Sequence, residues 1–488
     1  MKHIAKILLF MFCLCSGMAL AKEPRAFSHM TLAEIVSAID AGYNVAARDQ
    51  KNATALMWAA AYNSDPEAVL ALIKAGAEVN AKDKDNHSVL IWAAMNNANP
   101  QVITTLVKAG ADLKIETEAG ATVLMLAAGY NSNMDVVSAL IEAGSDVNAK
   151  DKMGGTPLVW AAAKSSNREI ITGLVKAGAD VNSRSNLSAT VLMIAVCNSS
   201  NPEIVKALIE SGADVNAKSE DGASVLMLAA AHCSCPEIIA ILVKAGADIN
   251  FKNNIGLTVL DFAVLKSKEP AIITALASAG ADVNLRDREG ETPLFRAASY
   301  NSNPEVVSAL VQAGADIKAK DSEGRSILMA AARASFNPEV IAKLVKLGAD
   351  LNVRNEYGDT ALHEAARSNS RTKIVSALIS AGLDVNIINE SGETPLMKAA
   401  TMNLSPDIID VLVKAGANIN AVDKRGSTAL MKAAWLNSNP EVVMALLKAG
   451  ADAKIKDQSG RSAFDYAKIN DKLKDSDAYW ELNQIRFD

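Results

Sequence analysis

The sequence predicts an all-α solenoid of stacked helix–turn–helix units joined by hairpin-like turns. Two observations support this prediction. First, one glycine recurs every 34 residues, and a fixed period of this length is typical of repeat architectures. Second, apolar residues make up 50% of the 488-residue chain but aromatic residues only 4%, a bias toward small side chains that allows helices to pack closely. The recurring glycines are Gly42, Gly76, Gly110, Gly144, Gly178, Gly212, Gly246, Gly280, Gly314, Gly348, Gly382, Gly416 and Gly450.

The first helix of each unit can be placed from residues 287–320. Gly290 lies in a turn where a positive φ is expected. Thr292 is the expected N-cap, and Pro293 takes the first helical position, where its missing N–H costs nothing. The first helix is therefore expected to run over residues 294–300.

The second helix of the same unit follows a polar break. Asn303 is the expected N-cap and Pro304 opens the helix. Val307 and Leu310 recur at helical spacing and supply the buried face. Gly314 is expected to end the helix in the left-handed conformation.

Three recurring motifs identify the repeat. The glycines lie within Lys-Ala-Gly-Ala-Asp-Val-Asn, as at residues 176–182. Thr-Pro-Leu follows at 156–158, 292–294 and 394–396, and then an Ala-Ala pair. This pattern resembles the ankyrin repeat, whereas the Trp, Leu-Gly and Tyr pattern of the equally long tetratricopeptide repeat is absent. The resemblance covers twelve repeats over residues 49–456.

The repeats depart from the family pattern in two places. Ankyrin repeats usually have 33 residues, and here one residue is added to the turn between the helices. The His of the family's Thr-Pro-Leu-His motif is present only as His363. Methionines such as Met57 and Met125 fill that column elsewhere, which we interpret as adaptable core packing.

The two ends of the chain differ from the repeats. Residues 1–21 have a basic start, a short apolar run and Ala-Leu-Ala, which predicts a cleaved signal peptide; an uncleaved anchor is the alternative. Residues 22–48 are expected to form a linker and a capping half-repeat. Residues 457–488 are expected to form a C-terminal capping repeat, because a solenoid needs polar ends to remain soluble. The signal predicts export, with the periplasm as the destination and secretion as the alternative.

Composition excludes several classes of function. The net charge is −6 with no block of Lys or Arg, so we expect no nucleic-acid binding. Beyond residues 1–21 no apolar run reaches membrane length, so we expect no membrane insertion after signal cleavage. His363 and Glu364 resemble the start of a zinc-protease motif, but Arg367 occupies the position of the second histidine. We therefore expect no enzyme, no catalytic residue and no cofactor.

One cluster could carry metal or redox chemistry. His232, Cys233 and Cys235 occupy a turn between helices, and thiolate and imidazole ligands suit copper or zinc. Cys197 lies in the corresponding region one repeat earlier, so a disulfide to one of the pair is a further alternative. Incidental, unpaired cysteines are the third interpretation.

The column just before the Ala-Ala pair changes character along the chain. Its first seven residues are apolar, and its last five include no large apolar residue. Either these side chains pack between repeats, or they form an aromatic ladder that binds a partner, because Trp and Tyr are enriched in interfaces. The partner-binding hypothesis comprises Trp58, Trp92, Leu126, Trp160, Ile194, Leu228 and Phe262, with Tyr62 and Tyr130 from a neighbouring column.

The leading hypothesis is an exported, monomeric scaffold for an unidentified protein partner. The resemblance to ankyrin repeats implies binding through the concave surface formed by the hairpin tips and first helices. The alternatives are a secreted effector that binds a host protein and, third, a metal- or redox-handling protein using His232, Cys233 and Cys235.

Overall fold

The computed structural model describes residues 23–485 except residues 268 and 369. The predicted signal peptide, residues 1–21, lies outside these residues. The all-α prediction is confirmed: the described ranges contain helices and isolated β-bridges but no strands. No helix in them is both long enough and apolar enough to cross a membrane.

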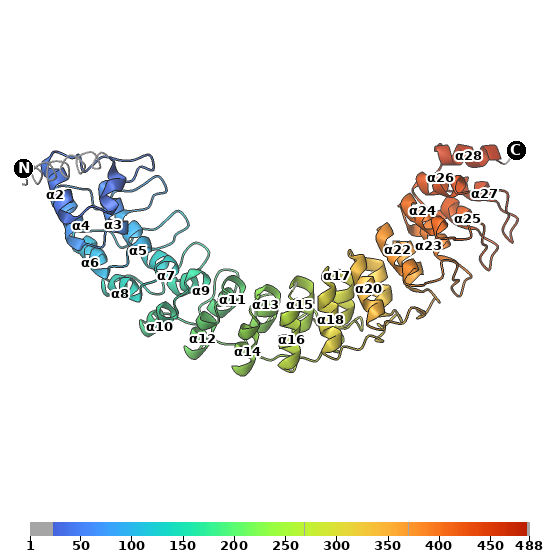
Figure 1. Cartoon of the computed structure of the whole chain (residues 1–488), viewed down its shortest axis with the longest axis horizontal. Coiled ribbons are helices and arrows are strands. Elements are labelled where there is room, and N and C mark those ends of the chain that lie inside the picture. Colours follow the sequence, from blue (N-terminus) through green and yellow to red (C-terminus); the bar gives the residue numbers. More distant parts are fainter. Residues whose placement is uncertain (1–22, 268, 369, 486–488) are drawn as a thin grey trace, which may run out of the picture. The chain divides into compact units, whose positions relative to one another are not determined.

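The chain divides into two compact units, Met1–Asp248 (unit 1) and Ile249–Asp488 (unit 2). In unit 1, first helices pack in one row and second helices in a parallel row, with hairpin turns projecting beyond the first row (Figure 1). The first-row elements are η1 (Pro24–Ser28), α3 (Ala55–Tyr62), α5 (Val89–Asn96), α7 (Val123–Tyr130), α9 (Pro157–Lys164), α11 (Val191–Asn198) and α13 (Val225–His232). The second-row helices are α2 (Leu32–Asp40), α4 (Pro66–Lys74), α6 (Pro100–Lys108), α8 (Met134–Glu142), α10 (Arg168–Lys176), α12 (Pro202–Glu210) and α14 (Pro236–Lys244).

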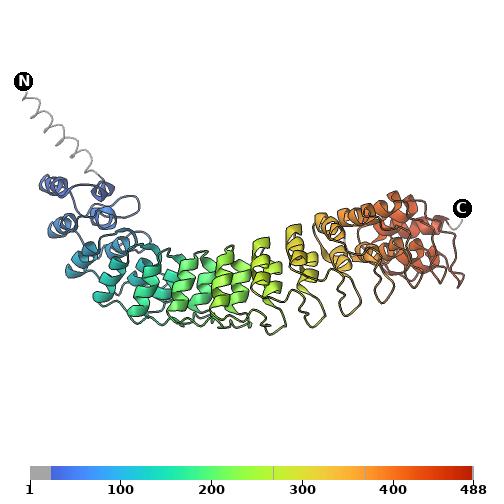
Figure 2. The same cartoon turned by 60° about the horizontal axis from the view of Figure 1, so that its bottom comes forward.

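Unit 2 has the same two rows, and Figure 2 shows its helices from another side. Its first-row helices are α15 (Val259–Lys266), α17 (Pro293–Tyr300), α19 (Ile327–Ala334), α21 (Ala361–Ser368), α23 (Pro395–Met402), α25 (Ala429–Leu436) and the short α27 (Ala463–Ala467). Its second-row helices are α16 (Pro270–Ser278), α18 (Pro304–Gln312), α20 (Pro338–Lys346), α22 (Thr372–Ser380), α24 (Pro406–Lys414), α26 (Pro440–Lys448) and α28 (Asp477–Ile485).

The predicted caps of residues 287–320 are found with one difference. Gly290 and Gly314 have φ of 78° and 97°, and Asn303 accepts a hydrogen bond from the N–H of Glu305. Thr292 occupies the N-cap position of α17, but its hydroxyl makes no capping bond and has no partner. The first helix therefore begins where predicted, although no side chain caps it. Its start is marked by the extended backbone of Thr292 and by Pro293 at the first helical position.

The residue added to the turn between the helices belongs to a buried asparagine ladder. The side-chain amide of Asn97 donates to the carbonyls of Ala60 and Asn63 in the preceding repeat, each at 2.8 Å, while its oxygen accepts from the N–H of Asn99 at 2.9 Å. Asn131 makes the same bonds one repeat later. Turns that carry this asparagine thus satisfy buried carbonyls of the preceding repeat, which would otherwise be costly.

A second ladder explains the Asp-Val-Asn motif of the hairpins. Asn182 donates to the carbonyl of Gly212 at 3.1 Å and accepts from the N–H of Asp214 at 2.9 Å. Asp180 in turn accepts from the N–H of Asn182. These motif residues fix the distance between successive hairpins, so the recurring aspartates are accounted for by structure.

The methionine column does more than fill the core. The N–H of Thr54 points at the sulfur of Met57 at 3.5 Å, and that of Thr122 at the sulfur of Met125 at 3.3 Å. His363 serves Thr360 in the same way through Nδ1. In the repeats of Met57, Met125 and Met329, the methionine sulfur therefore replaces the imidazole as an acceptor at the start of the first helix.

Candidate functional site

The predicted partner-binding residues lie on first-row helices. Trp58 and Tyr62 belong to α3, Trp92 to α5, and Leu126 and Tyr130 to α7. Trp160, Ile194 and Leu228 continue the column on α9, α11 and α13. Phe262 lies on α15 in unit 2, so the structure does not group it with the others. The candidate site is therefore the first-row surface of unit 1.

The three tryptophans of this column are anchored to hairpin carboxylates. Each indole N–H donates at 2.9 Å to the Oδ2 atom of an aspartate nine residues earlier. The other carboxylate oxygen accepts backbone N–H groups of the hairpin, as Asp151 does from Met153 and Gly155. The indoles are half-buried and satisfy a carboxylate that burial would otherwise leave short of a donor. The pairs are Trp58–Asp49, Trp92–Asp83 and Trp160–Asp151.

In unit 2, other side chains donate to the hairpin aspartate. Arg296 pairs with Asp287, Lys432 lies 2.8 Å from Asp423, and in α27 the hydroxyl of Tyr466 donates to a hairpin aspartate at 2.5 Å. Where the hairpin residue is Thr117, Ser185, Ser219 or Asn253, the column instead has Leu126, Ile194, Leu228 or Phe262.

The hairpin residue nine positions earlier is an aspartate wherever the column has a donor at Trp58, Trp92, Trp160, Arg296 or Lys432, whereas threonine, serine or asparagine precedes the apolar Leu126, Ile194, Leu228 and Phe262. Indole, guanidinium and ammonium groups thus meet one shared requirement, a donor for the hairpin aspartate, so packing does not demand the same residue type in every repeat. The nine-residue offset was visible in the sequence and could have revealed these pairs.

Tyr62 and Tyr130 are the exposed members of the candidate site. Their side chains are 47% and 50% exposed. Tyr62 stacks on Trp58 with ring centroids 5.7 Å apart, and Tyr130 meets Trp160 edge-on at 6.3 Å. Exposed rings supported by half-buried ones provide a rigid amphipathic surface, which suits partner contacts.

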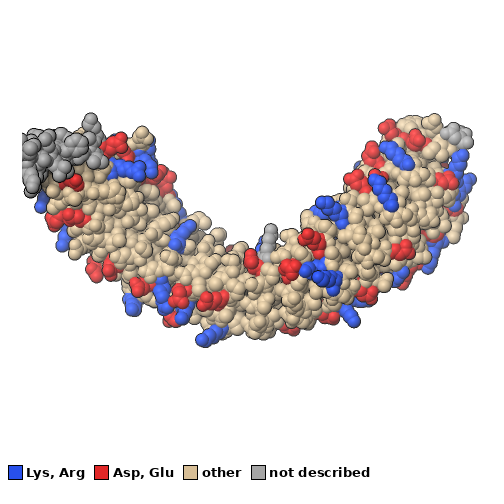
Figure 3. All heavy atoms as spheres, viewed as in Figure 1, with Lys and Arg blue, Asp and Glu red and all other residues tan. Residues whose placement is uncertain are grey.

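A groove of about 400 Å³ opens beside Trp160 and Tyr130. Leu126 and Met95 form the rest of its apolar wall. The hairpins contribute polar residues to its rim, namely Lys84, Asp85, His87, Thr117 and Glu118. On the face of unit 1 seen in Figure 3, acidic and basic side chains are interspersed.

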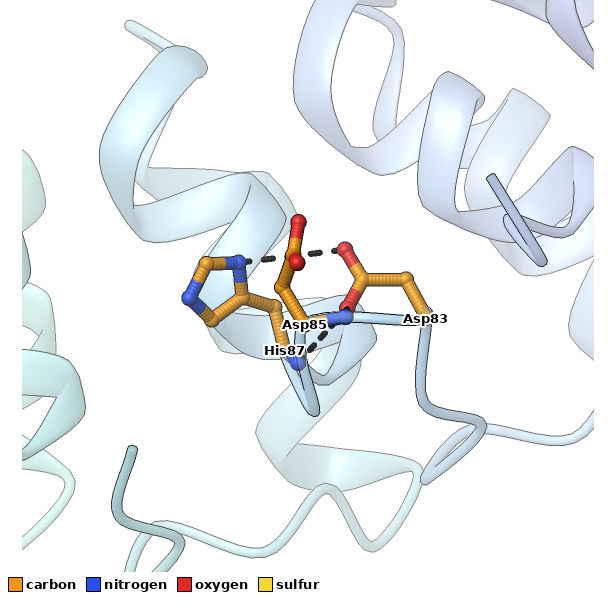
Figure 4. Close-up of side chains that lie close together, drawn as sticks. All are labelled: Asp83, Asp85 and His87. Atoms are coloured by element: carbon orange, nitrogen blue, oxygen red, sulfur yellow. Dashed lines mark hydrogen bonds and ion pairs between the residues drawn. The ribbon is translucent and has the colours of Figure 1, made fainter. Parts of the chain in front are cut away.

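Three side chains on one rim hairpin lie close enough to hold a metal ion. The ligand atoms of Asp83, Asp85 and His87 are within 4.8 Å of one another (Figure 4). The Oδ1 atom of Asp83 accepts from the backbone N–H groups of Asp85 and His87, and its Oδ2 atom accepts from the indole of Trp92. These bonds are the ones that the other tryptophan-bearing hairpins make, so the hairpin fold accounts for this cluster.

The residues of the predicted metal or redox cluster do not come together as a three-ligand group. Among the described residues, His232, Cys233 and Cys235 do not form a group with ligand atoms within 4.8 Å of one another. Cys233 is 3% exposed and fills the asparagine-ladder position, where its sulfur accepts from the N–H of Cys235 at 3.2 Å. Burial raises the pKa of the Cys233 thiol, which disfavours the thiolate that binds metals. Cys197, Cys233 and Cys235 are free.

Unit 2 carries an ion-pair network on its first-row surface. Glu393 lies 2.9 Å from Lys398 and 2.7 Å from Lys432. Burial raises the pKa of Glu393, but hydrogen bonds and charge from the two lysines outweigh it and hold that pKa at about 2. Burial lowers the pKa of His363, whose Nε2 atom contacts the carbonyl of Glu393.

The repeats match a known family along nearly the whole described chain. The model for ankyrin repeats in three copies matches residues 26–117, 90–185, 192–287, 260–355, 328–423, 362–457 and 405–475. The chain belongs to the ankyrin-repeat family. Ankyrin repeats serve as scaffolds for protein–protein interaction.

Comparisons with individual proteins add little to this assignment. No curated protein matches the sequence of this ankyrin-repeat chain. Among solved structures, it is similar to the crystal structure of the human ASB11 ankyrin repeat domain, with 27% identity and a TM-score of 0.41. That similarity covers 47% of this chain and 99% of the ASB11 domain.

Proposed function

We propose that this ankyrin-repeat protein is an exported, monomeric scaffold that binds a partner protein through the first-row surface of unit 1. One observation carries the proposal. Tyr62 and Tyr130 are half-exposed aromatic residues on a surface whose other aromatics are held rigidly by their aspartates. Such rings bury a large area on binding while losing little conformational entropy.

The tyrosines, and not the tryptophans, are the residues to change. Removing Trp58 or Trp92 would take the indole donor from the Oδ2 atom of Asp49 or Asp83 and would perturb the fold. The Tyr62 column contains asparagine in other repeats, at Asn96 and Asn198. The double variant Tyr62→Asn/Tyr130→Asn therefore places at both positions a residue that this column already accepts.

The experiment is affinity purification of the tagged mature protein from its own cells. A partner that is recovered with the wild type but is depleted about tenfold with the double variant would support the proposal. This depletion corresponds to one interface residue of moderate contribution. Lys266→Asn, in the same column but in unit 2, is the matched control and should leave recovery unchanged. Equal recovery with the wild type and the double variant would contradict the proposed surface.

The proposed location rests on the signal-like residues 1–21 and has its own test. Fractionation of cells should place the mature protein in the periplasmic fraction, with residues 1–21 removed. Recovery from the culture medium would favour the secreted effector, and recovery from the cytoplasm would exclude both forms of the proposal.

A further inference from the structure

An aromatic ring bound to a hairpin aspartate is, in two places, covered by a guanidinium group. In unit 1, Arg25 lies over the ring of Trp58, 5.4 Å from its centroid, and the Trp58 indole donates to Asp49. In unit 2, Arg461 lies 4.7 Å from the ring centroid of Tyr466, whose hydroxyl donates to an aspartate. In both places, an aromatic ring that donates to an aspartate has an arginine guanidinium over its face.

The chemistry of the arrangement explains the attraction. A cation above an aromatic face is stabilised by the negative potential of the ring. Donation of the ring's N–H or O–H to a carboxylate polarises the ring further and adds a negative charge nearby. An arginine side chain is suited to such a platform because its planar guanidinium stacks on aromatic faces and is weakly hydrated.

Trp160 has the same support without the cation. Its indole donates to Asp151 at 2.9 Å, as Trp58 does to Asp49. Over the described residues, no lysine or arginine lies over its ring. Instead the ring lines the groove of about 400 Å³.

The groove has the charge and the apolar wall that an arginine-bearing segment requires. Asp85 and Glu118 on its rim outnumber the single cation there, Lys84, so the local balance is acidic. Leu126 and Met95 offer contact to an apolar neighbour of the arginine. The face of Trp160 and the two carboxylates together suit one basic side chain flanked by aliphatic residues.

We propose that Trp160 is the platform for an arginine side chain of the partner protein, which is presented on a segment with apolar residues beside it. This inference rests on the proposed function and specifies the chemistry of the partner. Arg25 occupies the corresponding platform on Trp58, and the Trp92 ring packs edge-on against Trp58 at 5.1 Å, so we assign the external guanidinium to Trp160, the tryptophan that lines the groove.

The test uses the mature protein labelled with 5-fluorotryptophan and two blocked tripeptides, Leu-Arg-Leu and Leu-citrulline-Leu. The chain has five tryptophans, so the fluorine resonances can be assigned from single variants. We expect the arginine peptide to shift the Trp160 resonance saturably and to leave Trp58 unmoved. The citrulline peptide has nearly the same shape without the charge and should bind roughly 3- to 30-fold more weakly. Equal affinity for the two peptides, or no shift at Trp160, overturns the proposal.

Two variants keep the test independent of folding. Asp151→Thr/Trp160→Leu reproduces the natural Thr117–Leu126 pair of the neighbouring repeat, so it should fold and bind the two tripeptides equally, which calorimetry measures because this variant has no Trp160 resonance. Arg25→Gln should open the platform on Trp58, so that its resonance now responds to the arginine peptide. A Trp58 resonance that stays silent in this variant contradicts the proposal, because the same ring and carboxylate would then fail to hold an arginine.

The outcomes separate this inference from the proposed function. Loss of the partner in the tyrosine double variant together with identical binding of both tripeptides would retain the scaffold and reject the arginine platform. Arginine-specific binding at Trp160 with no effect of the tyrosine variant on partner recovery would retain the arginine platform and reject the proposed tyrosine surface.

Discussion

Unit 1 and unit 2 satisfy the same buried hairpin carboxylate with different chemistry. In unit 1, neutral indoles donate from Trp58, Trp92 and Trp160. In unit 2, Arg296 and Lys432 supply charged donors. A change in residue character along a repeat column therefore does not by itself indicate an interface. It indicates an interface only where the residues are not already explained by hydrogen bonds that they make within the chain.

The difference also sets how each surface can be used. In unit 2, the cations of the column form ion pairs with the chain's own carboxylates, as Lys432 does with Asp423 and Glu393. In unit 1 the aromatic donors satisfy the carboxylate through their edge and leave ring faces for other contacts. Unit 1 is thus better suited to bind basic or apolar groups.

The largest expected effect comes from removing the charged donor. Arg296→Leu leaves Asp287 and Asp261 buried beside Glu291 without their shared cation. Loss of one partner of a buried pair costs about 3–5 kcal/mol. Amide hydrogen exchange in α17 and α19 should show this loss in local opening free energy. Asp287→Asn/Arg296→Phe, which copies the natural Asn253–Phe262 pair, should recover much of it, and a smaller loss in the single variant would contradict the comparison.

The neutral donor should matter less. Trp160→Leu leaves Asp151 with one unsatisfied oxygen, which costs about 1–3 kcal/mol. Urea unfolding followed by circular dichroism, with exchange in α7 and α9, should report the loss. Adding Asp151→Thr removes the orphaned carboxylate and should restore most of the stability. If the double variant is no more stable than the single one, packing of the indole outweighs its hydrogen bond.

The ion-pair network should make unit 2 sensitive to acid. Although burial raises it, the folded-state pKa of Glu393 is about 2, below its ordinary value of 4.5, because Lys432 and Lys398 donate to the carboxylate. Its stabilising contribution is therefore fully present above about pH 4.5 and is lost as the pH falls toward 2. Opening free energies in α23 and α25 should decrease over this range, and Glu393→Gln should flatten the dependence. An unchanged slope in that variant would assign the acid sensitivity to other groups.

The smallest effect is expected at the exposed tyrosine. Tyr130→Asn should change the free energy of unfolding by less than about 0.5 kcal/mol, because the side chain is half-exposed. Thermal unfolding compared with the wild type measures it. A clearly larger loss would show that Tyr130 supports Trp160 structurally, and the tyrosine variants would then need to be replaced in the partner experiment.

The sequence by itself determined the helices, the period and the family. Local chemistry is sufficient for these features, because Pro304 and Asn303 fix a helix start and Gly314 fixes its end within a few residues of chain. Because the same signals recur every 34 residues, the helices assigned in one repeat predict the helices of the others.

Tertiary structure alone decided which side chains remain available for function. Met57 became a hydrogen-bond acceptor, Cys233 a member of the asparagine ladder and Trp160 the partner of Asp151. The physical reason is that burial obliges every polar group to find a partner, and a spacing in the sequence shows which groups meet only once the folded chain brings them together. What each residue can offer to another protein is what remains after those internal requirements are met.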